Sequence, residues 1–199
     1  KKMKNIRLIL IIAAVMSLFS CAAELNDPVV YSSTTRVLEA EYNARLLESN
    51  NVIVSNLPEL TLKEAETILS ELRNHVNADE ELQIKTDEFD DMQKWQVVMT
   101  HTINQKYIFT IQLNLTSYDD GSLFYNGYSN SCTLDEMKWQ VGGFSFSSKG
   151  DSDHFKFESQ SYLYLKIEGD EEPLCYLVPV SILGQYNPNN HEASFTYSL

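Results

Sequence analysis

The stretch that decides the fold runs from residue 95 to residue 115 and reads WQVVMTHTINQKYIFTIQLNL. Large apolar side chains recur at every second position before and after Asn104-Gln105, with His101 as the polar exception. This period of two is typical of β-strands that bury one face. A polar break between two such runs favours a hairpin. We therefore predict two antiparallel strands here.

The same alternation continues to the end of the chain. Residues 119–121, Asp-Asp-Gly, have the composition of a hairpin turn. Apolar positions change phase at Gly142-Gly143, which indicates a β-bulge. Further turns are predicted at 149–153, 169–173 and 187–190. The region after residue 82 therefore predicts seven or eight mostly sequential strands, and their short connections favour antiparallel pairing.

A helix is predicted before these strands, from Leu62 to Val76. Thr61 and Glu64 have the spacing of a capping box, in which each side chain binds a free amide at the helix start. The apolar residues follow helical spacing and form one stripe: Ala65, Ile68, Leu69, Leu72 and Val76. We expect this stripe to be a core face. A second, weaker helical pattern covers residues 35–48.

These elements predict an α+β fold for one domain, residues 35–199. The clear helix would pack on one face of a mostly antiparallel meander of about seven or eight strands. One version of this architecture resembles the cystatin fold, in which a curved sheet wraps a helix. The alternative is a β-sandwich with a helical extension.

The amino terminus has the features of an export signal. A basic start precedes the apolar run Leu8–Met16, which is too short for an ordinary membrane span. The run ends in Leu18-Phe19-Ser20-Cys21. This sequence resembles the lipobox of bacterial lipoproteins, with an aliphatic residue, a tolerant position, a small residue and the modified cysteine. The alternative is an ordinary cleaved signal peptide with a chance cysteine.

The resemblance implies cleavage before Cys21 and acylation of that cysteine. Residues 1–20 would then be the signal peptide, and residues 21–34 the acylated cysteine and a flexible tether. A single acyl chain anchors a protein only marginally, whereas two or three anchor it firmly. We expect a lipid-anchored protein of the cell envelope, in the outer membrane, and leave the leaflet open.

Charge restricts the possible partners. The whole chain has a net charge of −13, and residues 1–20 carry four basic residues and no acidic one. The remaining chain therefore has 11 basic and 28 acidic residues, a net charge of −17. Such a surface repels nucleic acid and anionic lipid headgroups. We expect membrane lipid to be contacted through Cys21, and an envelope protein or a glycan to be the other partner.

Two further cysteines, Cys132 and Cys175, form an even pair in a chain destined for an oxidising compartment. They are either bonded to each other or are two separate buried thiols. Sequence alone does not show the distance between them.

Motifs of known chemistry are absent from the sequence. It contains no His-Glu-x-x-His, no phosphate-binding glycine loop and no Gly-x-Ser-x-Gly elbow. We assign no catalytic residue, metal site or cofactor. Asp151, Asp153 and His154 could hold a cation, but a solvated turn explains them better. His101 lies on the apolar face of its strand, and we expect a hydrogen-bonded core histidine.

Tyrosine is the remaining lead, with 11 in the chain. Exposed tyrosines suit glycan or protein recognition because each combines a rigid face with a hydroxyl group. The alternative is that they occupy half-buried positions on strands. The candidates for ligand binding are Tyr125, Tyr128, Tyr162, Tyr164 and Tyr186.

Two functions of different class follow. The first is a non-enzymatic binding or assembly module for a protein or glycan, acting through sheet-face aromatics and acidic loops. The second is a glycan- or peptide-directed hydrolase with paired carboxylates, which requires two acids facing each other across a cleft. The candidate acids are Asp87, Asp90, Asp119, Asp151 and Asp153. We prefer the binding module, because no motif supports the enzyme.

Overall fold

The computed structural model describes residues 33–47, 53–119, 123–147 and 155–199. Val37–Leu199 form one compact unit. The predicted signal peptide, Cys21 and most of the predicted tether lie outside the described residues, as do Asp151, Asp153 and His154.

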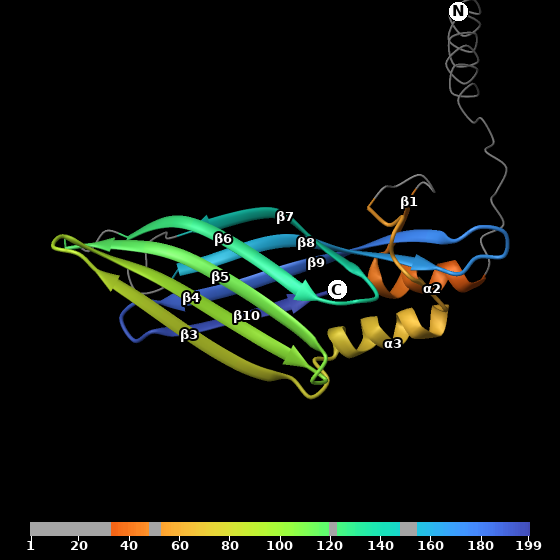
Figure 1. Cartoon of the computed structure of the whole chain (residues 1–199), viewed down its shortest axis with the longest axis horizontal. Coiled ribbons are helices and arrows are strands. Elements are labelled where there is room, and N and C mark those ends of the chain that lie inside the picture. Colours follow the sequence, from red (N-terminus) through yellow and green to blue (C-terminus); the bar gives the residue numbers. More distant parts are fainter. Residues whose placement is uncertain (1–32, 48–52, 120–122, 148–154) are drawn as a thin grey trace, which may run out of the picture. The chain divides into compact units, whose positions relative to one another are not determined.

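Four antiparallel strands form the first sheet, in the order β3-β4-β5-β6 (Figure 1). Their bounds are Asp79–Glu88 for β3, Met92–Ile103 for β4, Tyr107–Tyr118 for β5 and Leu123–Thr133 for β6. The hairpin predicted from residues 95–115 is the β4–β5 pair, with Trp95 opposite Leu115. That prediction is confirmed.

The second sheet is built around two long central strands, β8 (Phe155–Ile167) and β9 (Leu174–Asn187). The other members are β1 (Arg45–Leu47), β2 (Glu59–Leu60), β7 (Lys138–Ser147) and β10 (Glu192–Ser198). β7 and the short parallel strand β2 flank successive parts of β8. β10 and β1 flank successive parts of β9 in the same way. The sheet is therefore about four strands wide along its length.

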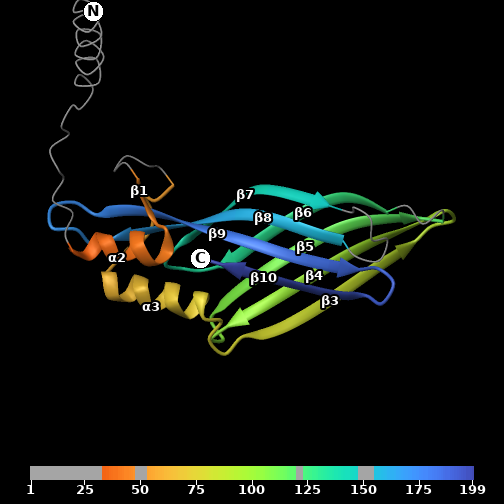
Figure 2. The same cartoon turned by 180° about the vertical axis from the view of Figure 1, so that it is seen from behind.

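The two sheets pack face to face, as Figures 1 and 2 show from opposite sides. Alternate residues of each strand point inward, because successive side chains of a strand lie on opposite faces. Val97, Ile111 and Leu113 from the first sheet and Val178 and Ile182 from the second are fully buried in one cluster. This shared interior makes the fold β-sandwich-like.

Helix α3 (Leu62–Arg73) begins with the predicted capping box. Thr61 Oγ1 accepts a hydrogen bond from the Glu64 amide at 3.3 Å, and Glu64 Oε2 accepts one from the Thr61 amide at 2.8 Å. Four of the five predicted stripe residues, Ala65, Ile68, Leu69 and Leu72, are buried and form a core face, whereas the helix ends at Arg73, before Val76. α3 packs against β2 and β8. Figures 1 and 2 show both helices at the end of β8 and β9 that lies beyond the first sheet.

The predicted α+β fold, with a helix covering a meander, is wrong, and so is its cystatin-like version. The inner face of each sheet is covered mainly by the other sheet. A helix of 12 residues such as α3 spans about 18 Å, whereas a strand of 12 residues such as β4 spans about 40 Å. One helix of this length cannot cover such a sheet.

The structure also tests two local predictions, the extent of the first helix and the β-bulge at Gly142-Gly143. Helix α2 (Ser33–Tyr42) is shorter than the predicted 35–48, because Asn43 adopts a left-handed φ of 51° and the chain continues as β1. The predicted bulge at Gly142-Gly143 is confirmed by a register shift between Val141 and Phe144. A Cβ on Gly142 would lie 2.6 Å from the carbonyl oxygen of Gln160, so the bulge requires glycine there.

Candidate functional site

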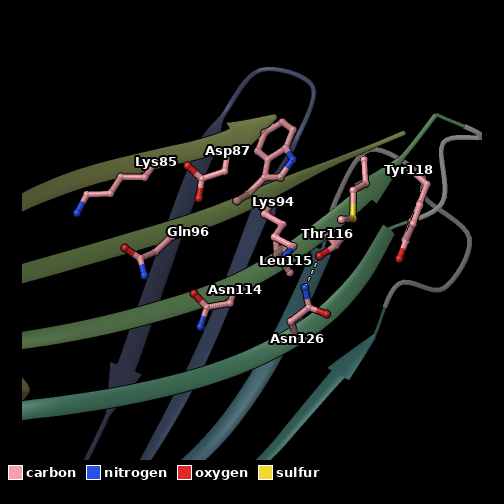
Figure 3. A pocket seen from close by; sticks show the side chains of 11 residues that line it. Lys85, Asp87, Lys94, Gln96, Asn114, Leu115, Thr116, Tyr118 and Asn126 are labelled. Carbon is pink, nitrogen blue, oxygen red and sulfur yellow. Dashed lines mark hydrogen bonds between the residues drawn. The ribbon is translucent and has the colours of Figure 1, made fainter. Parts of the chain in front are cut away.

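The outer face of the four-stranded sheet carries an open groove of about 700 Å³ (Figure 3). This face is polar because it holds the positions between the apolar ones in each strand. The groove is lined by Lys85, Asp87, Met92, Lys94, Trp95, Gln96, Asn114, Leu115, Thr116, Tyr118 and Asn126. All four strands of the sheet contribute to it.

Amides and a hydroxyl form the middle of this groove. We call Gln96, Asn114, Thr116 and Asn126 the amide groove; they lie on three neighbouring strands (Figure 3). Asn126 Nδ2 donates to Thr116 Oγ1. A Cβ on Gly127 would lie 3.3 Å from Asn114 Nδ2, so the missing side chain leaves room for that amide.

The β5–β6 bulge gives the amide groove its shape. The register between these strands shifts at Asn114/Leu115, where Asn114 lies opposite Gly127 and Leu115 lies opposite Tyr125. Asn126 is the extra residue between those two partners. Gln112 Nε2 donates to Asn114 Oδ1 at 3.3 Å, which orients the Asn114 amide. The bulge therefore places a third amide beside those of β4 and β5.

Three charged side chains lie toward the β3 edge of the groove. Asp87 on β3 is directly opposite Lys94 on β4, and Lys85 lies two residues before Asp87 on the same face. Lys94 Nζ lies 4.9 Å from the centroid of the Phe89 ring, within the range of a cation–π contact.

An exposed aromatic pair lies at the turn end of the same face. Tyr118 is 40% exposed and Phe124 is 55% exposed, and their ring centroids are 5.4 Å apart in an edge-to-face arrangement. Phe124 is the cross-strand partner of Thr116, so the rings adjoin the amide groove. Sequence reasoning missed both residues. Both aromatic residues occupy strand positions at which the alternation predicts an outward-facing polar side chain, and this exception could have identified them.

The five predicted tyrosines do not come together in one site. Tyr125 is 37% exposed and stacks on Phe144, while Tyr128 is half-buried and accepts a hydrogen bond from Asn130 Nδ2 at 2.7 Å. Both lie on the side of the sandwich where β6 approaches β7. Neither lines the groove.

The other three belong to the second sheet. Tyr162 and Tyr164 lie on its outer face, where Tyr164 is buried in a small cluster with Val54 and Cys175. Tyr186 is fully buried, with its hydroxyl 3.2 Å from His191 Nδ1. Burial raises the pKa of Tyr186 above its ordinary range. Tyr164 and Tyr186 therefore present no exposed ring to a ligand.

The candidate acids of the hydrolase are separated from one another in the fold. Asp87 lines the groove, whereas Asp90 and Asp119 are exposed at turns and outside its lining. Asp151 and Asp153 lie outside the described residues. Within the described part of the chain, Asp87 is the single carboxylate of the groove.

A second pocket, of about 620 Å³, lies beside α3 and holds three carboxylates. Each has a structural partner: Glu64 caps α3, Glu71 accepts from Asn104 Nδ2 at 3.0 Å, and Glu136 pairs with Lys106. Lys106 Nζ donates a hydrogen bond to the charged carboxylate, which lowers the pKa of Glu136. These acids hold the helix and two turns together.

His101 is a core histidine, as predicted. It is buried, its ring stacks on Phe195 with centroids 3.9 Å apart, and its Nε2 lies 3.2 Å from Glu80 Oε1. Burial lowers its pKa. Across the described ranges, no group of three or more His, Cys, Asp or Glu side chains has the geometry to hold a metal ion.

Cys132 and Cys175 are free thiols, and the disulfide considered from the sequence is not formed. Cys132 packs against the main core opposite Phe109, whereas Cys175 belongs to the small cluster on the outer face of the second sheet. Burial raises the pKa of the Cys132 thiol to about 12. Neither thiol has the environment of a nucleophile.

No helix in the described part of the chain is both long and apolar enough to span a membrane. Comparison with curated proteins and with solved structures gives no significant match. A family model described as "Domain of unknown function (DUF5033)" matches residues 27–199. The chain therefore belongs to this family.

Proposed function

We propose that this protein is a lipid-anchored module of the cell envelope that binds a glycan without catalysing a reaction. The observation that carries the proposal is the amide groove with the exposed Tyr118–Phe124 pair beside it. Together they offer hydrogen-bonding and apolar surfaces on one open face.

The chemistry of the groove matches that of a sugar. Each Asn or Gln side chain carries donors and an acceptor. The Thr116 hydroxyl is buried and accepts from Asn126 Nδ2, so it orients that amide. Sugar hydroxyls also donate and accept, so neighbouring amides can bind successive hydroxyls. The C–H face of a sugar ring is apolar, and the exposed rings of Tyr118 and Phe124 offer apolar faces for it.

Anchoring through Cys21 is part of the proposal and is supported by the lipobox-like sequence Leu18-Phe19-Ser20-Cys21. Two or three acyl chains would hold the protein firmly at the membrane. The net charge of −17 after residue 20 would keep the folded domain from lying on anionic lipid. The groove would then remain open to a ligand.

The hydrolase hypothesis has less support. Glycoside hydrolysis usually uses two carboxyl groups about 5–10 Å apart. The described lining of the groove supplies one, Asp87. The second pocket supplies three, but each of them already has a structural partner.

A glycan array tests the binding function, with the full-length chain in neutral detergent as the probe. We expect binding to a defined group of oligosaccharides, and a loss of about tenfold or more in Asn114→Ala and in Tyr118→Ala. The matched control is Leu183→Ala, because Leu183 is 56% exposed on the outer face of the other sheet. Absence of binding, or equal losses in all three variants, would contradict the proposal.

Metabolic labelling with an alkyne fatty acid tests the anchor. The wild-type protein should incorporate the label and partition into the detergent phase, whereas Cys21→Ser should do neither. Equal labelling of the two forms would place the acyl group elsewhere or exclude it.

A further inference from the structure

Resting on the proposed glycan-binding function, we propose that the ligand of the amide groove is anionic. It would be an oligosaccharide whose sugars carry a carboxylate or a sulfate group, bound by the ammonium groups of Lys85 and Lys94. Two observations support this: the position of the two lysines in the groove, and the absence of an ion-pair partner for either of them among the described residues.

Lys85 and Lys94 differ from Lys106 and Lys166, which form ion pairs with glutamates of other segments. Lys106 pairs with Glu136, and Lys166 Nζ lies 2.8 Å from Glu59 Oε1. Among the described residues, no carboxylate lies within 4.0 Å of Lys85 or Lys94. Lys94 Nζ lies over the Phe89 ring, and neither ammonium group is held in an ion pair.

The charge of the groove is opposite to that of the whole chain. Two lysines and one aspartate line it, whereas the chain carries a net charge of −13. An anionic sugar would be repelled by most of the surface and attracted to this place. Such charge complementarity directs an anionic ligand to the groove and also strengthens its binding there.

Cross-strand register shows how a charged sugar would fit. One row across the sheet is Asp87, Lys94, Thr116 and Phe124, and the next is Lys85, Gln96, Asn114 and Gly127. Directly opposite residues in neighbouring strands have Cβ atoms about 5 Å apart. A sugar ring on Phe124 that extends along this row, over the buried Thr116, therefore brings its substituent toward Lys94.

The second row extends the same arrangement. It runs from a lysine through two amides to Gly127, where no side chain fills the groove. A neighbouring sugar in this row would direct its own substituent toward Lys85. Each of two adjacent rows of the sheet would then receive one charged sugar.

Isothermal titration of the full-length protein in neutral detergent tests the inference with two matched pairs of probes. The carboxylate pair is tetragalacturonate and its fully methyl-esterified form. The sulfate pair is a carrageenan tetrasaccharide and its desulfated form. We expect one charged probe to bind about tenfold more tightly than its neutral counterpart. The difference should shrink as sodium chloride is raised, because salt screens exposed charges.

Charge-removing variants locate the effect. Lys94→Gln and Lys85→Gln should each reduce the preference for the charged probe, measured as the ratio of its affinity to that of the neutral probe. Lys138→Gln, an exposed lysine on the other sheet, is the control and should keep the full preference. Thermal unfolding of all three should match that of the wild type, since none of these lysines is buried.

The outcomes separate the two proposals. Equal binding of charged and neutral probes overturns the anionic ligand and leaves a glycan-binding groove. A preference that survives both groove substitutions also overturns it, because the charge would then be recognised elsewhere. Failure of every probe to bind contradicts the glycan-binding function itself.

Discussion

The hydroxyl of Tyr197 donates a hydrogen bond to the main-chain carbonyl oxygen of Leu72 at 2.9 Å. The two residues are 125 positions apart and join the last strand to the last turn of α3. The final carbonyls of a helix lack intrahelical donors, and the Leu72 carbonyl accepts both this buried bond and one from the His75 amide at 3.2 Å. The Tyr197 ring stacks on Phe109, with centroids 4.8 Å apart. Tyr197 therefore fixes the helix to the sandwich.

Tyr197→Phe should lower the free energy of unfolding by about 0.5–1.5 kcal/mol, because the buried Tyr197–Leu72 hydrogen bond is lost while the ring packing and the His75 amide bond to the same carbonyl remain. Urea denaturation followed by tryptophan fluorescence measures this change. The control is Tyr118→Phe, whose exposed hydroxyl should matter by less than about 0.5 kcal/mol. Equal effects of the two substitutions would show that the Leu72 bond contributes little.

Gly142→Ala and Gly143→Ala form a matched pair at the β7 bulge. A Cβ on Gly142 would meet the Gln160 carbonyl oxygen at 2.6 Å and the Tyr162 ring at 2.8 Å, whereas one on Gly143 would meet nothing within 4 Å. Gly142→Ala should therefore cost about 1–3 kcal/mol of stability, and Gly143→Ala less than about 0.5 kcal/mol. Melting temperatures of the two variants give the comparison. A reversed order would mean that the bulge has a different geometry.

His101 should make stability depend on pH in the range where histidines titrate. Burial lowers its pKa below the ordinary 6.5, against a smaller opposing effect of Glu80. The unfolded chain therefore binds a proton at His101 more readily than the folded chain does. The resulting stability is fully present above the unfolded pKa and is lost as the pH falls through 6.5 toward the folded pKa.

Urea midpoints between about pH 7.5 and about pH 5.5 measure that loss. The decrease in the wild type should exceed the decrease in His101→Gln, which has no proton to bind. Parallel curves for the two proteins would show that other groups cause the dependence.

The cysteines should be counted with a thiol reagent, without reductant. Cys132 and Cys175 should be unreactive in the native protein, because both are shielded and burial raises the pKa of each thiol. Both should react after denaturation. A denatured protein with no reactive thiol would indicate a disulfide, and reaction at a third position would show that Cys21 is not acylated.

Gly127→Val should close the groove without unfolding the domain. The added side chain would press on the Asn114 amide, since a Cβ alone would lie 3.3 Å from its Nδ2. Glycan binding should fall by about tenfold, while the melting temperature changes little because Gly127, opposite Asn114, lies on the outer face. Undiminished binding would place the ligand away from Asn114.

The local features of this protein were determined by the sequence itself. The capping box of Thr61 and Glu64, the stripe from Ala65 to Leu72, the 95–115 hairpin and the Gly142 bulge could all be predicted. Each depends on neighbours within a few residues and on the periods of helix and strand. The prediction of acylation at Cys21 also rests on sequence alone.

Tertiary structure decided what each apolar face packs against. Alternation identified Val97 and Val178 as inward-facing, but the same pattern suits a helix or a second sheet as the partner. It also decided which aromatics are exposed: Tyr186 is buried and Phe124 is not, although both lie on strands. The amide groove combines residues from three strands, brought together by register and by the β5–β6 bulge. Such contacts depend on long-range packing, which no local period encodes.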